Sequence, residues 1–199
     1  MLIYDIEIRN AIPDRGGVTA PDVQYCEGWG DHKGMGIAVV GCYDYASDRY
    51  RIFCEDNLDH LQLLIKQHDM IVGFNNRCFD DRVLAAAGVF IPEGKSYDIL
   101  DEIWRSLRLP LQFDPRVHGG YSLRALCQVN FRTSKTGDGK SAPALWQRGQ
   151  IGTVVDYCLA DVALTKKLLD RIIRTGQLVN PKPAPECISI RRPGAEQVL

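Results

Sequence analysis

Two carboxylates interrupt an otherwise apolar stretch near the start of the chain, where residues 2–8 read Leu-Ile-Tyr-Asp-Ile-Glu-Ile. This pattern predicts a β-strand, and in a strand residues i and i+2 lie on the same face. Asp5 and Glu7 therefore point the same way, while the apolar residues beside them point into a core. By itself, such a pair is usually an ordinary solvated strand face, so a second signal is needed to give it a function.

A second acidic signature, Tyr157-Cys158-Leu159-Ala160-Asp161, lies near the other end of the chain. On a helix residues i and i+4 share a face, so Tyr157 and Asp161 point together. Three carboxylates that converge repel one another unless a divalent cation lies between them. Hard oxygen ligands favour magnesium, manganese or calcium. The two signatures together predict a metal site.

A third segment lies between these signatures and reads Gly73-Phe74-Asn75, with Phe79-Asp80 and Leu84 following it. Taken in order, the three segments resemble the three motifs of the DEDD 3′-to-5′ exonucleases of the ribonuclease H-like superfamily. The tyrosine at position 157 resembles that of the DEDDy branch. Asp80 rather than Asp81 is the match, because the family's carboxylate directly follows the phenylalanine. The resemblance runs from residue 1 to about residue 172.

This resemblance implies an α/β protein with a ribonuclease H-like fold: a mixed central sheet, an antiparallel meander followed by parallel strands, flanked by helices. It also implies a metal-dependent 3′-to-5′ exonuclease that hydrolyses single-stranded nucleic acid to 5′-mononucleotides. DNA is favoured over RNA as the substrate, but RNA stays an open alternative because no motif encodes a contact to the 2′-hydroxyl. Two divalent cations, Mg²⁺ or Mn²⁺, are the implied cofactors. Asp5, Glu7 and Asp161 are expected to hold the first ion, and Asp80 to support a second that Asp5 bridges.

Tyr157 is expected to take part in catalysis without acting as the base. An unperturbed phenol has a pKa near 10, so at neutral pH it is a poor general base and a good hydrogen-bonding group. We therefore expect Tyr157 to orient the attacking water. Asp156 precedes it and no histidine stands at the corresponding place, so the DEDDh form of the mechanism is not expected.

The charges of the chain are segregated, although the net charge is only -1. Residues 104–148 carry a net charge of +6, from two acidic side chains, Asp114 and Asp138, and eight basic ones: Arg105, Arg108, Arg116, Arg124, Arg132, Lys135, Lys140 and Arg148. Such a segment is typical of a substrate track beside an acidic metal site, and equally of a solvated surface.

Three residues are predicted to contact the 3′ end of a single strand. Asn75 either touches the terminal nucleotide or only holds the turn between a strand and a helix. Lys135 and Lys140 lie in a loop, residues 132–141, that either contacts phosphates or is a plain surface loop. A replication, repair or helicase protein is a possible partner that delivers the substrate.

Length and composition favour one domain, residues 1–179, followed by a proline-containing, loosely ordered tail, residues 180–199. Seven cysteines form no C-x-x-C pair, and carboxylates interrupt the N-terminal region where a signal peptide would be apolar. We therefore expect a cytoplasmic protein. No apolar run approaches the ~20 residues of a membrane-spanning helix, so no membrane role is expected.

The apolar pattern predicts strands at 2–8, 36–43, 49–54, 70–72 and 96–98, with the second one central. Helices are expected to begin after Asn57, near Phe79, after residue 98, after Ser122 and at Thr153.

Two alternative functions remain open at this stage. One is a ribonuclease H-like module that binds nucleic acid with weak or no catalysis, which the presence of all four carboxylates disfavours. The other is an endonuclease of the ribonuclease H class, for which the Tyr-x-x-x-Asp ending is the wrong signature.

Overall fold

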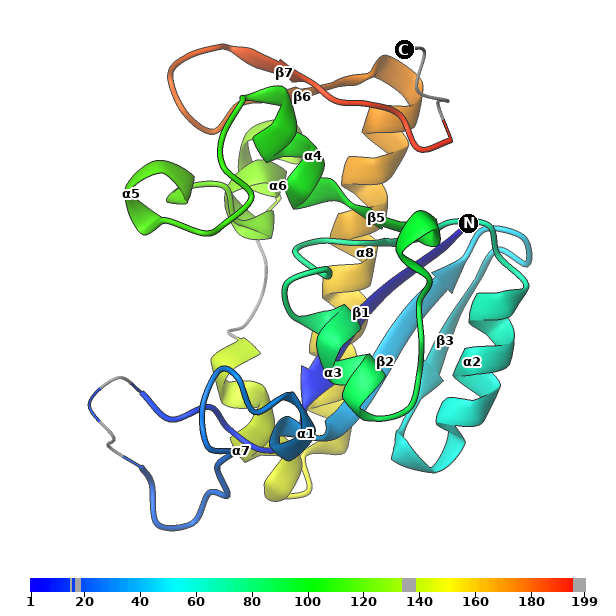
Figure 1. The fold of residues 1–199 in the computed structure, drawn as a ribbon, viewed down its shortest axis with the longest axis vertical. Helices are drawn as coiled ribbons and strands as arrows, with labels where there is room; N and C mark the ends of the chain where they lie inside the picture. Colours follow the sequence, from blue (N-terminus) through cyan, green and yellow to red (C-terminus); the bar gives the residue numbers. More distant parts are fainter. Residues whose placement is uncertain (15, 17–18, 134–138, 195–199) are drawn as a thin grey trace.

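A five-stranded mixed sheet forms the centre of the molecule (Figure 1). The computed structural model describes residues 1–14, 16, 19–133 and 139–194. The strand order is β3-β2-β1-β4-β5. β2 pairs antiparallel with both β1 and β3, and β4 pairs parallel with both β1 and β5. An antiparallel meander followed by parallel strands is the predicted ribonuclease H-like α/β arrangement, so this prediction is confirmed. The strands are β1 (Leu2–Ile8), β2 (Ile37–Asp44), β3 (Arg49–Phe53), β4 (Ile71–Gly73) and β5 (Ser96–Asp98).

Helices cover both faces of this sheet. On one face the even-numbered apolar side chains of β1 pack with buried side chains of α2 (Leu58–Lys66) and α3 (Asp80–Ala86). On the other face Ile3 packs with α4 (Ile99–Ser106) and with the long helix α8 (Ile151–Thr175). Asp5 and Glu7 alternate with Tyr4 and Ile6 along β1, so they share the face that α8 covers. The predicted strand alternation therefore holds.

The remaining described elements are short or lie at the ends of the sheet. They are α1 (His32–Met35), η1 (Glu55–Asn57), η2 (Glu93–Lys95), α5 (Pro115–His118), α6 (Leu123–Phe131), η3 (Gly139–Ser141), α7 (Ala142–Gln147), β6 (Gln177–Val179) and β7 (Cys187–Ser189). Within the described ranges, no helix combines the length and the apolarity that crossing a membrane requires.

The predicted helix starts agree with the observed ones to different degrees. Ser122 caps α6 as expected, because its side chain accepts the N–H of Ala125 at 3.2 Å. Asn57 precedes α2, but its side chain instead accepts the N–H of Cys54. Thr153 does not begin α8. Gly149, with φ of 75°, turns the chain out of α7, so α8 starts two residues before Thr153.

The chain beyond residue 179 is more ordered, as far as residue 194, than the loose tail expected from its sequence. β7 pairs antiparallel with β6, and Ile188 and Ile190 are buried in the core. Arg191 forms a two-pronged ion pair with buried Glu102 on α4, with N···O distances of 3.1 and 2.9 Å. The expected boundary at residue 179 therefore falls inside a hairpin. A short β-strand with only two buried isoleucines resembles a tail in sequence.

Candidate metal centre

Three of the predicted metal ligands converge in the structure. Asp5 and Glu7 lie on β1, and Asp161 lies on α8. Each offers one carboxylate oxygen, and these oxygens all lie within 4.8 Å of one another. Glu7 and Asp161 are buried, while Asp5 is half-buried. We call these three residues the acidic triad.

The triad forms because α8 approaches the sheet unusually closely at one glycine. Gly41 of β2 lies opposite Asp5 in the strand register. The N–H of Gly41 donates to the Cys158 sulfur at 3.1 Å, and the Cys158 thiol donates to the carbonyl oxygen of Asp5 at 3.3 Å. A Cβ at position 41 would lie only 2.9 Å from that sulfur. The missing side chain therefore lets α8 bring Asp161, three residues after Cys158, against β1.

The thiol of Cys158 is a structural group and not a nucleophile. Burial raises its pKa well above the usual value, and the charges of Asp5 and Glu7 raise it further. A thiol with a raised pKa stays protonated, and a protonated thiol is inert and able to donate a hydrogen bond. The negative charge of the triad thus stabilises the contact that seats α8.

The chemistry of the donor set fits a hard divalent cation. The triad supplies three carboxylate oxygens and no sulfur or nitrogen ligand. Oxygen-only sites favour magnesium, manganese or calcium over zinc or copper. Three negative charges at this spacing, two of them on buried side chains, are held together most favourably by such an ion.

Asp80 is close to β1 but is not one of the three triad residues. It is the first residue of α3 and is buried. Burial raises its pKa well above the usual range, the charges of Asp81 and Asp98 raise it further, and the backbone amide of Ile6 opposes this rise. Ile6 lies between Asp5 and Glu7 in the sequence, so Asp80 lies beside the strand that carries two of the three triad residues.

Asp81, the neighbour that the sequence excluded as a ligand, has a structural role. Its carboxylate accepts hydrogen bonds from the Tyr4 hydroxyl, from Ser96 Oγ at 2.9 Å and from Asn76 Nδ2 at 3.2 Å. These contacts tie α3 to β1 and β5. The choice of Asp80 rather than Asp81 as a metal ligand stays a prediction.

Tyr157 lies one helical turn before Asp161 on α8 and is half-buried. The i, i+4 spacing places its ring on the same side of the helix as the triad carboxylate. The predicted pairing of the phenol with Asp161 on one helix face therefore holds. The role of Tyr157 in orienting the attacking water stays a prediction.

The loop that leads into α3 is held by a buried carboxylate that the sequence analysis did not single out. Asp98 Oδ1 accepts the N–H of Asn75 at 2.8 Å, and Oδ2 accepts the N–H of Arg77 at 3.1 Å. Oδ1 also caps α4 through the N–H of Leu100. Burial, with a smaller contribution from the charge of Asp101, raises the pKa of Asp98 to about 6. An aspartate between a strand and a helix was the available signal.

Asn75 has the backbone conformation of a turn residue. Its φ of 64° lies in the left-handed region, which asparagine tolerates better than most residues. Together with the bond to Asp98, this conformation supports the turn-holding alternative for its backbone. Contact of its side chain with a nucleotide stays a prediction.

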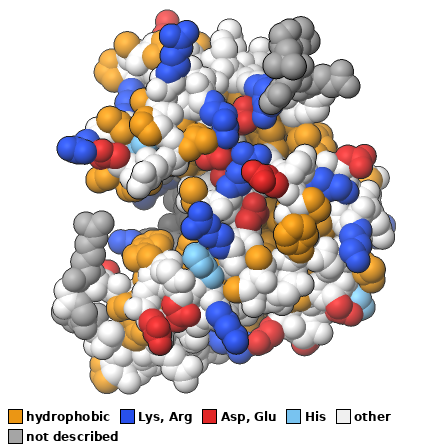
Figure 2. Space-filling model, viewed as in Figure 1, with side chains coloured by type: hydrophobic (Ala, Val, Ile, Leu, Met, Phe, Trp, Pro, Cys, Tyr) orange, Lys and Arg blue, Asp and Glu red, His pale blue; other side chains and the backbone are white. Residues whose placement is uncertain are grey.

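The basic segment at residues 104–148, predicted as a substrate track, is only partly described by the structure, and acidic side chains neutralise several of its cations. Lys135 lies outside the described residues, and Lys140 is exposed in η3. Among the described residues of this segment, ion pairs join Arg105 to Glu102, Arg116 to Asp114 and Arg148 to Asp22. Figure 2 shows basic and acidic side chains interspersed over the face in view. In its described part, the +6 segment therefore has acidic partners beside several of its cations.

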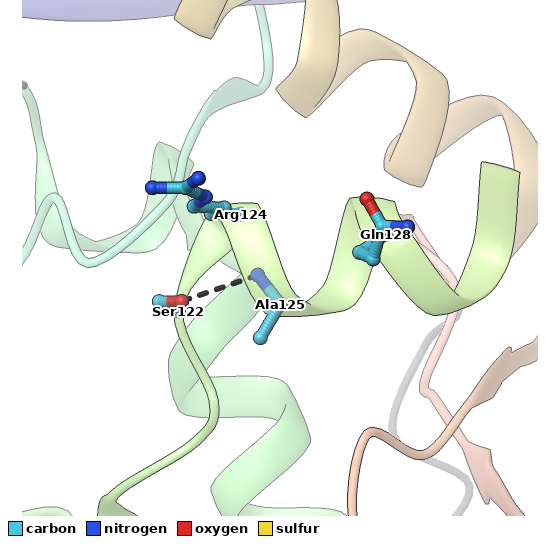
Figure 3. A pocket seen from close by; sticks show the side chains of 4 residues that line it. All are labelled: Ser122, Arg124, Ala125 and Gln128. Atoms are coloured by element: carbon cyan, nitrogen blue, oxygen red, sulfur yellow. Dashed lines mark hydrogen bonds between the residues drawn. The ribbon is translucent and has the colours of Figure 1, made fainter. Parts of the chain in front are cut away.

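A shallow depression lies at α6 (Figure 3). Ser122, Arg124, Ala125 and Gln128 line it, and Arg124 and Gln128 rise from the same side of the helix. The hydrogen bond from Ala125 to Ser122 is the cap of the helix. None of the predicted site residues lines this depression.

Comparisons with known proteins give a likeness of fold. No protein-family model and no curated protein matches the chain. Among solved structures, it is similar to the family B DNA polymerase from the hyperthermophilic archaeon Pyrobaculum calidifontis, with a TM-score of 0.56 and 17% sequence identity. The match covers 86% of this chain but 24% of the polymerase chain. The ribonuclease H-like α/β fold of this protein is thus shared with a segment of a DNA polymerase.

Proposed function

We propose that this protein is a metal-dependent 3′-to-5′ exonuclease that releases 5′-mononucleotides from single-stranded nucleic acid. The observation that carries the proposal is the convergence of Asp5, Glu7 and Asp161, with their oxygens within 4.8 Å. Tyr157, on the same helix as Asp161, matches the tyrosine of the DEDDy signature. The likeness to a segment of a DNA polymerase supports DNA over RNA as the substrate.

Each residue of the centre has a distinct role in this proposal. Asp5, Glu7 and Asp161 hold one divalent cation, and Asp80 supports a second beside β1. Two bound cations would lower the pKa of a water and stabilise the attacking and leaving oxygens of the phosphodiester. Tyr157 donates or accepts a hydrogen bond that orients the attacking water. Asn75 and Lys140 are proposed to contact the 3′-terminal part of the strand.

A time course on a 5′-labelled single strand with magnesium or manganese tests this function directly. A ladder of products that shortens from the 3′ end is expected. The Asp161→Ala variant and a reaction with chelator are the controls, and both should yield no ladder. Internal cuts would instead indicate an endonuclease, and binding without products would indicate a module that has lost catalysis.

The nature of the strand is tested in the same assay. Matched DNA and RNA oligonucleotides of one sequence should be degraded at different rates, with DNA faster. Since the 2′-hydroxyl is the group by which a protein distinguishes the two, equal rates would remove DNA preference from the proposal while leaving the exonuclease activity.

A further inference from the structure

Trp29 is an exposed aromatic residue beside the second motif. Its side chain is 68% exposed, and its ring meets that of Phe79 edge-on, with 6.1 Å between the centroids. Phe79 packs against the core and directly precedes Asp80. Tryptophan is usually highly buried, because its large apolar surface stabilises the folded state most when it leaves water. An indole that stays exposed beside a candidate active centre therefore has a face available for a ligand.

The loop that carries Trp29 is fixed by its own hydrogen bonds. The carboxylate of Asp31 accepts the N–H of Glu27 at 3.0 Å and that of Gly34 at 2.8 Å. The N–H of Asp31 in turn donates to the carbonyl oxygen of Gly28. Since these bonds flank the tryptophan on both sides, the indole is positioned before any ligand arrives. Such preorganisation lowers the entropic cost of binding.

This loop lies at the edge of the sheet where the candidate centre opens. β1 and β4 are parallel, so their carboxyl ends meet at one edge, and α3 begins there after β4. The backbone N–H groups of Arg9 and Asn10, just beyond β1, donate to the carbonyl oxygen of Met35 at the end of α1. Trp29 precedes α1 and contacts Phe79, so it belongs to the same edge as Asp80.

We propose that Trp29 is a substrate-positioning residue whose indole stacks on an unpaired base near the 3′ end of the single strand. The inference rests on the proposed exonuclease function. An aromatic face stacks on any of the bases, which suits an enzyme that must accept each nucleotide in turn. Stacking one base at this edge places the phosphodiester next to it toward Asp80, which directly follows the Phe79 ring that Trp29 contacts.

The fluorescence of Trp29 gives a readout that does not depend on catalysis. Of the three tryptophans, Trp104 is buried and Trp146 is half-buried, so Trp29 is the one that a ligand reaches most easily. A short oligothymidylate added in the presence of chelator is expected to quench the emission of the wild-type protein. A matched strand with abasic residues at its 3′-terminal positions should quench far less, because it keeps the phosphates and lacks the bases.

Variants separate stacking from other causes. Trp29→Ala should bind the oligothymidylate roughly 5- to 100-fold more weakly, the range expected when one stacked base loses its aromatic partner. Trp29→Phe keeps an aromatic ring and should bind within a few-fold of wild type, while its quenching disappears. The salt dependence of binding should not change, since no phosphate contact is lost. Phe90→Ala is the matched control, because Phe90 is 64% exposed and lies against α2 through Gln62.

The outcomes distinguish this inference from the function on which it rests. If the strand is degraded from its 3′ end and Trp29→Ala binds and degrades it as wild type does, the exonuclease stands and the stacking role is wrong. The exposed indole would then be a contact for a protein partner. If no variant and no wild-type protein binds or degrades a single strand, the function and the stacking role both fall.

Discussion

The thiol of Cys158 on α8 donates a hydrogen bond to the backbone carbonyl oxygen of Asp5 on β1, with 3.3 Å between sulfur and oxygen. The same sulfur accepts the N–H of Gly41 on β2. One small side chain therefore fixes α8 against two neighbouring strands at the level of the triad. The distance between Asp161 and Asp5 depends on how closely the helix approaches Gly41.

Gly41→Ala should push α8 away from the sheet. The new methyl group would meet the Cys158 sulfur at 2.9 Å and Val162 Cγ2 at 3.3 Å, and overpacking of a well-packed interior costs about 1 to 3 kcal/mol. Nuclease activity should fall as well, since Asp161 moves with the helix. Urea denaturation and turnover of the same preparation measure the two effects.

Gly152→Ala is the matched control for that substitution. Gly152 lies in the first turn of α8, where an added Cβ would meet nothing within 4 Å. Alanine is favoured over glycine in a helix by roughly 0.5 to 1 kcal/mol, so this variant should be as stable as wild type or more so. Unchanged stability and activity in Gly41→Ala would contradict the close-approach account of the triad.

Asp98→Asn should change how stability depends on pH. Burial, and then the charge of Asp101, raises the pKa of Asp98 to about 6 from an ordinary value of 3.8. Ionising this carboxyl therefore costs the folded state more than the unfolded one. Its contribution to stability is full below pH 3.8 and is lost as the pH rises through 6, by about 3 kcal/mol for a shift of this size.

Asparagine cannot ionise, so the Asp98→Asn variant should not lose stability in this way as the pH rises. Between pH 4 and pH 7 the free energy of unfolding of Asp98→Asn should rise relative to that of wild type. Denaturation at several pH values measures the difference. A difference that stays constant over this range would mean that Asp98 does not titrate as its burial implies.

The catalytic roles predict a graded series of activities. Asp161→Ala should lower turnover by at least ~100-fold, because it removes a proposed direct metal ligand. Tyr157→Phe should lower turnover by only ~10- to 100-fold with little change in KM, since a water is still activated and only its orientation suffers. Single-turnover rates with saturating enzyme measure the chemical step of both variants, and rates at several substrate concentrations measure KM. Full activity of Tyr157→Phe would make the tyrosine a packing residue.

Local sequence signals predicted most of the elements, because alternation and helical period are properties of neighbouring residues. The strand with Asp5 and Glu7 and the helix with Tyr157 and Asp161 were recognisable in this way. Their convergence was inferred from a resemblance between ordered motifs, and the structure brings three carboxylates together as that resemblance implies.

Local sequence signals do not predict contacts between segments that are far apart in the chain. Gly41 reads as an ordinary residue in an apolar strand, and its role depends on a cysteine 117 positions away. The hairpin of β6 and β7 was missed for a similar reason, since Ile188 and Arg191 are anchored by elements that precede them by many residues. Trp29 lies between two glycines and outside every predicted strand and helix, so no local pattern singled it out.

The triad should affect the thermal stability of the protein even when no substrate is present. Like charges ~4 Å apart repel by about 4 kcal/mol at an effective dielectric of 20, so the metal-free protein is strained at this site. A cation that binds only the folded state adds about 2.7 kcal/mol at a hundred times its Kd. Magnesium or manganese should therefore raise the melting temperature by several degrees. Asp161→Asn should equal or exceed wild type in chelator, because it relieves repulsion, and should gain little from metal.

Asp170→Asn is the control for the loss of a carboxylate on the same helix. Asp170 is paired with Lys166 and with the Tyr45 hydroxyl and is not one of the triad residues, so this variant should gain as much from manganese as wild type does. Thermal melts of the three proteins, with chelator and with manganese, decide between the possibilities. If wild type gains nothing, or if Asp161→Asn gains as much as Asp170→Asn, then Asp5, Glu7 and Asp161 do not share an ion. The nuclease proposal would then lose its physical basis.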